Sequence, residues 1–412
     1  MGTDFQGRKK SARQKMIATK NFVFMNVTDE QVAHRRIFTK ALKAYGPGVA
    51  HLESVMQETI LDIIDTLDQK NGQPVSCKDL TSGLACCVIA SLMFGEKYSF
   101  DDQICKDLKN MSTLILDAID PLSKGAVLDV LPFLLKFQFV LPDNQKMLRR
   151  ARKIADKFVW SRIAHAKKTF DPSDKRGCLD YFIEAQQQDF DKDGKPVLDD
   201  EGMKGLLLSF VNAGIETSSR SLTQIFLDIL SIPGLQKDLQ EEIDKQFEPT
   251  QVITLKDKDK LPQLESYMME HFRYLSLLPF LFPHMTVRDT EVAGFKIPAD
   301  TMVLMNSYYL AHNPDVYDDP FTVQPKRFLD KNGQVVDRDH PLRQNFFAFG
   351  MGRRSCTGEL LAKSRIFLFV ANLLQKYNLE VFGELPDSDI RKYKMATVFL
   401  PPNYHMRLLR RQ

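Results

Sequence analysis

Apolar residues recur at three- and four-residue spacing along much of this chain, a pattern that predicts helices. The spacing predicts helices over residues 51–69, 77–95 and 101–119, followed by a long charged helix over residues 143–169. It also predicts a long helix from about residue 199 to residue 230, a charged helix over residues 234–247 and an apolar helix over residues 359–377. Residues 28–38 carry a capped helix start. Most of the elements that this pattern predicts are therefore helices.

Strand-like patterns are short and lie in the last third of the chain. The pattern predicts a hairpin over residues 287–298 and a strand over residues 301–310. Residues 277–284 form an apolar segment that is expected to lead into a strand. Asn-Pro and Asp-Pro pairs at residues 313–314 and 319–320 mark loops, and a last apolar turn covers residues 395–399. Turn and loop signals therefore separate the strand candidates.

The bulk composition is that of an ordinary soluble globular enzyme, since 43% of the 412 residues are hydrophobic and 26% are charged. No linker rich in Ser, Gly or Pro divides the chain, which favours a single domain over residues 1–412. A net charge of +3 is too small to indicate a nucleic-acid partner.

The cysteines and the apolar runs bear on the compartment. The six cysteines include no Cys-x-x-Cys pair and follow no secretory leader, so a reduced compartment without disulfides is expected. No run of eighteen or more apolar residues occurs, so no membrane span is expected. The polar residues 1–10 resemble neither a signal peptide nor a transit peptide. The chain as given therefore reads as soluble or cytoplasmic.

One short stretch, residues 349–358, places Cys356 in a turn rich in glycine and arginine, directly before an apolar helix. Free N–H groups and the helix dipole at such a position favour a thiolate, and Arg354 can hold an anionic group beside the sulfur. A thiolate against an open planar surface is what a haem iron needs as its cysteine ligand. The other interpretation of a lone cysteine is a buried structural residue.

Two further groups of residues carry possible chemistry. In the long helix, the small pair Ala213 and Gly214 precedes the acid Glu216 and the alcohol Thr217. A Thr hydroxyl can bond a carbonyl one turn back and open the helix, and an acid next to an alcohol can relay protons. An ordinary helix crossing explains this pattern as well.

Glu270 and Arg273 form the second group, because they are three residues apart and share one helix face on which they can pair. Most such pairs lie on the surface and contribute less than ~1 kcal/mol.

The strongest motif resembles the haem-binding loop of the cytochrome P450 family. Its pattern, Phe-x-x-Gly-x-Arg-x-Cys-x-Gly, is filled at every fixed position by Phe349, Gly352, Arg354, Cys356 and Gly358. The resemblance implies a cytochrome P450 fold, mainly helical with small β-sheets. It also implies haem b with Cys356 as the axial thiolate, and a cofactor-binding role for Phe349, Arg354 and Gly358.

The same resemblance gives roles to the other groups. It implies that Glu216 and Thr217 are the catalytic pair of an oxygen-activating helix. It also implies that Glu270 and Arg273 form a buried structural cluster with Arg327, although Lys326 stands where that segment usually has Glu.

Haem propionates are held in the family by a Trp-x-x-x-Arg pair and by a later partner. Here Arg35 is in place, Gln31 stands where the Trp is expected, and His284 occupies the later position. Residues 5–8 resemble a segment that follows the membrane anchor, the first helix and the first two strands of the family. The chain is therefore expected to lack these N-terminal parts, leaving the strand over residues 301–310 with an unpaired edge.

The expected function is that of the animal microsomal group of steroid and xenobiotic hydroxylases. The resemblance implies a monooxygenase that uses O2, an apolar steroid, fatty acid or xenobiotic, and electrons from an NADPH-cytochrome reductase, with cytochrome b5 as an optional partner. It also implies a place on the cytosolic face of the endoplasmic reticulum membrane. The expected substrate pocket is lined by Ala213, Leu277, Leu278, Phe282 and Val398.

A basic face near Cys356 would suit an acidic flavoprotein, although a solvated surface explains it equally well. Its expected members are Arg343, Arg353, Lys363 and Arg365.

Two other functions stay open at this stage. The fold could serve as an isomerase or dehydratase that needs no reductase, against which the retained acid–alcohol pair argues. The chain could also be inactive or bind haem only, as the expected truncation and the changes at Gln31 and Lys326 suggest.

Overall fold

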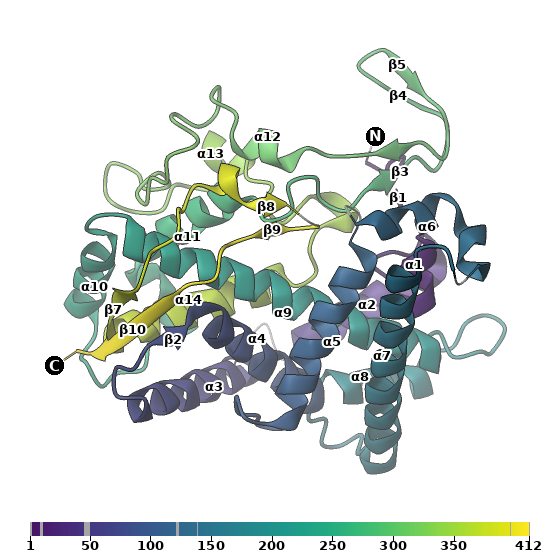
Figure 1. The fold of residues 1–412 in the computed structure, drawn as a ribbon, viewed down its shortest axis with the longest axis horizontal. Coiled ribbons are helices and arrows are strands. Elements are labelled where there is room, and N and C mark those ends of the chain that lie inside the picture. The colour runs from purple at the N-terminus through teal and green to yellow at the C-terminus, as the bar shows by residue number, and fades with distance from the viewer. Residues whose placement is uncertain are drawn as a thin grey trace.

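Helices dominate the computed structural model of the chain, which describes residues 2–8, 11–44, 50–120, 123–137, 139–395 and 397–411 (Figure 1). The α-helices are α1 (Ala12–Ile17), α2 (Asp29–Ala44), α3 (Ala50–Gln69), α4 (Cys77–Phe94), α5 (Gln103–Ile119), α6 (Val127–Val130), α7 (Pro142–Thr169), α8 (Cys178–Gln188), α9 (Asp200–Ser231), α10 (Leu235–Gln246), α11 (Pro262–Leu275), α12 (Ser307–Ala311), α13 (Pro341–Gln344) and α14 (Glu359–Lys376). The helices predicted from apolar spacing are confirmed: α3, α4, α5, α7, α9, α10 and α14 begin and end within two residues of the expected bounds.

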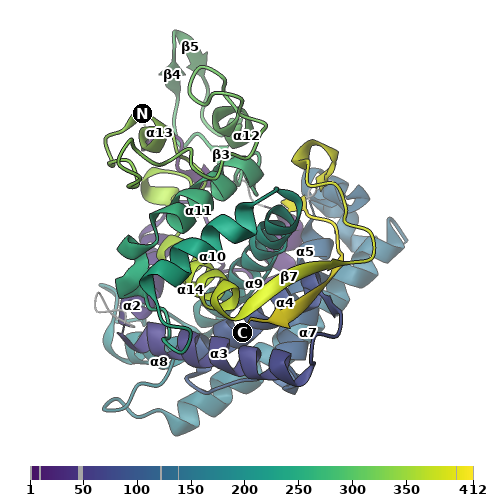
Figure 2. The ribbon, with the colours of Figure 1, turned by 90° about the vertical axis from the view of Figure 1, so that its left-hand side faces the viewer.

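The strands are short and form small antiparallel sheets. They are β1 (Gly7–Arg8), β2 (Val75–Ser76), β3 (His284–Met285), β4 (Thr290–Val292), β5 (Phe295–Ile297), β6 (Met302–Val303), β7 (Tyr377–Phe382), β8 (Lys394–Met395), β9 (Phe399–Leu400) and β10 (His405–Arg410). The sheet orders are β1-β3-β6, β2-β10-β7, β4-β5 and β8-β9. The predicted hairpin, β4–β5, projects from the body in both views, and the β7–β10 sheet lies near the C-terminus (Figures 1 and 2).

The predicted strand over residues 301–310 is wrong beyond its first residues. Only Met302–Val303 pairs, and α12 begins at Ser307. Asn306 caps this helix, because its side chain accepts a 2.9 Å bond from the Tyr309 N–H. The strand that does form is paired on one side only, with β3.

The strand expected over residues 277–284 is also much shorter, since only its last residue, His284, joins β3. A turn replaces the rest of it, and Leu281 within that turn has a φ of 48°.

Helix α9 crosses the core and packs against α4, which is itself mostly buried. From Gly202 to Ile229 every residue of α9 is buried except residues 212–214, 216–217 and 220. A Cβ on Gly214 would lie 2.5 Å from the Ile89 side chain of α4, so glycine is needed there for the helices to approach. The accessible positions recur at three- and four-residue spacing and therefore define one face of α9.

By length and composition, α4 (Cys77–Phe94) is the one helix in the described part of the chain that could cross a membrane. However, 78% of its residues are buried inside the fold. This burial is that of a core helix.

Candidate active site

Cys356 lies in a tight loop directly before the N-terminus of α14. Gly350 and Gly352 have φ values of 71° and 64°, which favour glycine, and the Cys356 N–H donates a 2.9 Å bond to the Phe349 carbonyl. Gly358 is the N-cap residue of α14. Cys356 is exposed, whereas the other five cysteines are buried. The loop therefore presents a single accessible thiol at the start of a helix.

The thiol is not activated by the protein alone. Desolvation raises the pKa of Cys356 above its ordinary value, against the Gly358 N–H, Arg35 and Lys363, which lower it. The Gly358 N–H acts in the predicted direction, but burial outweighs it in the protein without a metal ion. A coordinating metal would deprotonate the thiol.

Arg354 and Arg35 fasten the loop to its neighbours. The Arg354 guanidinium donates to the Gln6 and Met25 carbonyls at 2.9 Å each and to the Phe22 carbonyl at 3.4 Å. Arg35 donates from α2 to the Ser355 carbonyl at 2.8 Å. These bonds hold the cysteine loop against the N-terminal segment and α2.

Arg8 and His284 lie opposite each other in the β1–β3 pair. Arg8 is buried and donates to the Phe282 carbonyl at 2.8 Å, and the His284 ring nitrogen Nδ1 lies 2.5 Å from the Phe5 carbonyl. The strands approach closely because residue 7 is glycine: a Cβ there would lie 2.7 Å from the Met285 carbonyl oxygen. Sequence reasoning missed Arg8 as a site residue, and its place after the Phe-Gln-Gly string was the only signal.

Arg8, Arg35, Arg354 and His284 form what we call the basic cluster. Burial and neighbouring arginines lower the pKa of Arg8 to about 10, and burial with Arg35 lowers that of Arg354 to about 10. Burial lowers the pKa of His284 too, as do Arg8 and Arg354. Among the described residues, no Asp or Glu forms an ion pair with the three arginines.

Half-buried cations without a counterion fit an anionic group, because burying charge is costly unless it is paired. The two propionates of haem b are such a group, and the accessible Cys356 thiol supplies the ligand its iron requires. The residues present therefore fit haem b.

Replacing Arg8 by Met is expected to weaken haem binding roughly 10- to 100-fold, because a charge-assisted bond contributes about 1.5–3 kcal/mol. Titrating the haem-free variant with haem measures this. The control is Arg36→Met, which removes a neighbouring cation of α2 whose side chain is 69% exposed. Equal affinities of the two variants would contradict an anion-binding role for the basic cluster.

The accessible face of α9 carries Ala213, Glu216, Thr217 and Arg220. The Thr217 hydroxyl donates to the Ala213 carbonyl one turn back, as expected. Glu216 does not bond Thr217. Its carboxylate pairs with Arg220 at 2.9 Å and accepts a 3.2 Å bond from the Thr113 hydroxyl of α5. Sequence reasoning missed both partners, since neither Arg220 nor Thr113 belongs to the motif.

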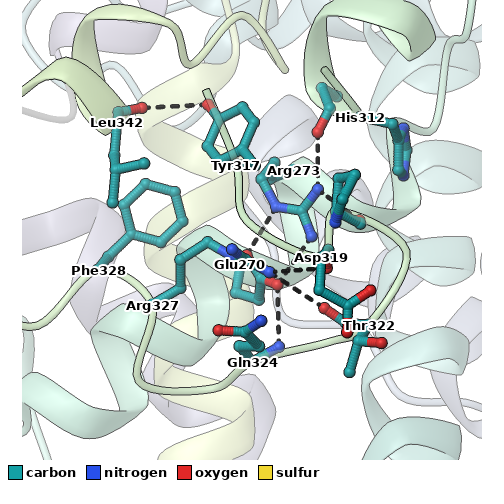
Figure 3. A network of polar contacts seen from close by, with 12 residues as sticks. Glu270, Arg273, His312, Tyr317, Asp319, Thr322, Gln324, Arg327, Phe328 and Leu342 are labelled. Carbon is teal, nitrogen blue, oxygen red and sulfur yellow. Dashed lines mark hydrogen bonds and ion pairs between the residues drawn. The ribbon is translucent and has the colours of Figure 1, made fainter. Parts of the chain in front are cut away.

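The acidic and basic side chains expected to cluster do lie together (Figure 3). Glu270 is fully buried and accepts bonds from Arg273 at 2.7 and 2.8 Å and from Arg327 at 3.0 Å. It also accepts a 2.9 Å bond from the Gln324 backbone N–H. The guanidinium nitrogens also donate to backbone carbonyls. Those of Arg273 bond the Ala311 and Pro320 carbonyls, and those of Arg327 bond the Asp318, Asp319 and Thr322 carbonyls.

Aromatic side chains join this cluster to the cysteine loop. Phe272 of α11 packs edge-on against Phe349 at 5.1 Å, and Phe328 packs edge-on against Phe346 at 6.1 Å. Lys326 points away from the cluster and pairs with Asp238 of α10 at 3.0 Å. The change from the usual Glu therefore leaves the buried cluster complete.

Gln31 is buried, and its side-chain amide donates to the Phe22 carbonyl at 3.3 Å. Its side-chain amide is therefore bonded to the N-terminal segment.

The expected pocket residues lie on three parts of the fold. Ala213 is on α9, and Phe282 packs edge-on against Phe24 at 5.3 Å. The Leu277 carbonyl accepts a 3.0 Å bond from the Phe399 N–H, next to the buried Val398. Leu278 accepts a bond from the Ser307 hydroxyl.

His312, beside the acidic–basic cluster in Figure 3, makes the fold sensitive to acid. Burial lowers its pKa from 6.5 to about 4, so the folded state binds fewer protons than the unfolded state between these values. The free energy of unfolding should fall as the pH drops from 7 to 5, by up to about 2 kcal/mol from this group. Urea unfolding of the wild type and of His312→Gln at both pH values measures the loss, which should be smaller in the variant. An equal loss in both proteins would contradict this assignment.

Comparison with known proteins adds a family match to this geometry. The sequence model of the family described as Cytochrome P450 matches residues 2–408. Cytochrome P450 2C23 of Rattus norvegicus is 28% identical over 379 residues, which cover 92% of this chain and 74% of the rat protein. Cytochrome P450 1A1 of Cavia porcellus is 32% identical over 290 residues, which cover 70% of this chain and 54% of that protein. The chain thus spans between about half and three quarters of the relatives it matches.

Proposed function

Because this chain belongs to the cytochrome P450 family, we propose that it is a haem-thiolate monooxygenase that inserts one oxygen atom of O2 into an apolar organic substrate. The observation that carries the proposal is the pairing of an accessible Cys356 thiol with the basic cluster that lacks a counterion. Haem b, when bound, supplies the iron that takes up electrons and activates dioxygen.

The residues of this chain would bind and orient the haem. Cys356 would be the axial ligand, and Arg8, Arg35, Arg354 and His284 would hold the propionates. Phe349 and Gly358 would shape the loop around the sulfur.

On α9, the Thr217 hydroxyl and the Glu216 carboxylate would hold protons for the reacting oxygen, while the ion pair with Arg220 would keep the Glu216 carboxylate in place. Transfer requires the Thr217 hydroxyl to leave the Ala213 carbonyl that it bonds at rest.

An electron-donor site is supported by the surface of α2. A groove there is lined by Val32, Arg35, Arg36, Thr39, Lys40 and Lys43. It adjoins the cysteine loop, because Arg35 bonds the Ser355 carbonyl. We infer that an acidic reductase of the NADPH-dependent class docks here, with cytochrome b5 as an optional donor. Arg365, expected on a basic face near Cys356, is only 1% exposed and is therefore not part of that surface.

The proposed substrate class and compartment are those that family membership supports. We propose that Ala213, Leu277, Leu278, Phe282 and Val398 would line an apolar substrate pocket, which would suit a steroid, a fatty acid or a xenobiotic. Similarity to vertebrate members of the P450 2C and 1A1 groups supports action at the cytosolic face of the endoplasmic reticulum membrane.

The test is the absorption spectrum of the reduced, carbon monoxide-bound protein, followed by substrate oxidation with NADPH and reductase. A strongly red-shifted Soret band and product that depends on NADPH are expected. A red-shifted band with peroxide rearrangement and no dependence on reductase would replace the proposal with an isomerase or dehydratase. Absence of the band would leave an inactive protein.

A further inference from the structure

Arg365 of α14 is buried in the core with no acidic partner among the described residues. It is 1% exposed, and its Nη2 donates to the Gly214 carbonyl of α9 at 2.8 Å and to the Ser218 hydroxyl. Its Nε and Nη1 atoms have no hydrogen-bond partner in the part of the chain that the structure describes. The Cys86 thiol of α4 is the neighbouring ionisable group.

This arrangement is costly for the fold. A buried guanidinium without a counterion loses hydration that its two neutral acceptors replace only in part. Burial lowers the pKa of Arg365 to about 10, so the side chain stays charged at neutral pH. An apolar side chain of similar length would fill the same space without this cost.

Two consecutive carbonyls of α9 each accept a side-chain donor. The Gly214 carbonyl accepts from Arg365, and the preceding carbonyl, of Ala213, accepts from the Thr217 hydroxyl. In a regular helix these carbonyls serve the N–H groups of Ser218 and Thr217. Extra donors on two consecutive carbonyls compete with those N–H groups and loosen the helix.

We propose that Arg365 is a positioning residue that loosens the hydrogen bonding of the continuous helix α9 at Gly214. Because α14 begins three residues after Cys356, this one side chain links the helix behind the thiolate to the helix that carries Glu216 and Thr217. The link sets the space beside Ala213 in which oxygen and substrate react. This inference rests on the proposed function.

The test compares Arg365→Met, which removes the charge and both bonds, with Arg365→Lys, which keeps the charge and one donor. The control is Lys376→Met, which removes a cation at the other end of the same helix. Thermal unfolding and hydrogen exchange of peptides spanning residues 210–222 are measured on haem-free protein. Imidazole affinity is measured by absorption on haem-loaded protein.

In Arg365→Met we expect an unchanged or higher melting temperature, although α9 has lost a contact. Exchange of the Ser218 amide should slow roughly two- to tenfold, because the Gly214 carbonyl then bonds the Ser218 N–H alone. Imidazole should bind more weakly by a similar factor, because the closed helix leaves less room. Arg365→Lys should restore part of both effects, and Lys376→Met should show neither.

A lower melting temperature with unchanged exchange and imidazole affinity would overturn the proposal, and so would a Met variant that does not fold. Either result would make Arg365 a packing residue. If the wild type forms no thiolate-ligated haem, the proposed function fails, while the exchange result on haem-free protein still decides the role of Arg365.

Discussion

Replacing Glu270 by Ala is expected to destabilise the fold by about 3–5 kcal/mol, because two buried arginines lose their common counterion. Arg273 and Arg327 would keep their bonds to backbone carbonyls but lose the carboxylate with which each forms an ion pair. A loss of this size is a large fraction of the stability of a typical protein. The measurement is the midpoint of urea unfolding, together with the yield of soluble protein.

The matched control is Glu265→Ala, in the same helix α11. Glu265 also pairs with a cation, Lys258 at 2.8 Å, but both side chains are partly exposed. Its loss should cost less than about 1 kcal/mol. Similar losses for the two variants would show that burial does not set the strength of the Glu270 cluster.

Cys356→Ser is expected to abolish the red-shifted band of the carbon monoxide complex and the oxidation of substrate. Serine keeps the size of the side chain but does not supply a thiolate to iron. The haem-free variant should unfold within about 0.5 kcal/mol of the wild type, because the side chain is exposed.

Cys105→Ala should behave in the opposite way. Cys105 is buried, and its sulfur lies 3.5 Å from that of Cys87 on α4. Its loss should lower stability while the red-shifted band stays. If the Cys356→Ser protein kept the red-shifted band, Cys356 would not be the haem ligand, and the proposed chemistry would be contradicted.

Apolar spacing predicted the long helices well, because a buried helix needs apolar residues along the whole of its contact face. Helix α9 is the clearest case, since its predicted and observed ends differ by one residue each. The strand over residues 301–310 was wrong because a local side-chain bond, from Asn306, starts a helix within it. The spacing of apolar residues does not indicate whether such a bond or strand pairing is the more stable alternative.

The site divides in the same way. Cys356, Glu270 and Arg327 were predicted because they occupy fixed positions in short motifs. Arg8 and Arg365 look like ordinary surface cations in the sequence. Their roles depend on burial and on partners from distant elements, which the sequence around them does not reveal.

The Arg354 contacts also determine when the site can form. The bond from Arg354 to the Gln6 carbonyl joins residues 348 positions apart, and that from His284 to the Phe5 carbonyl spans 279 positions. Closing such long loops is slow compared with forming a helix. At ~5–20 residues per second, the ribosome needs roughly 20–70 s to make the chain between Gln6 and Arg354. The basic cluster is therefore incomplete on every nascent chain, and haem is captured only after the cysteine loop has left the ribosome.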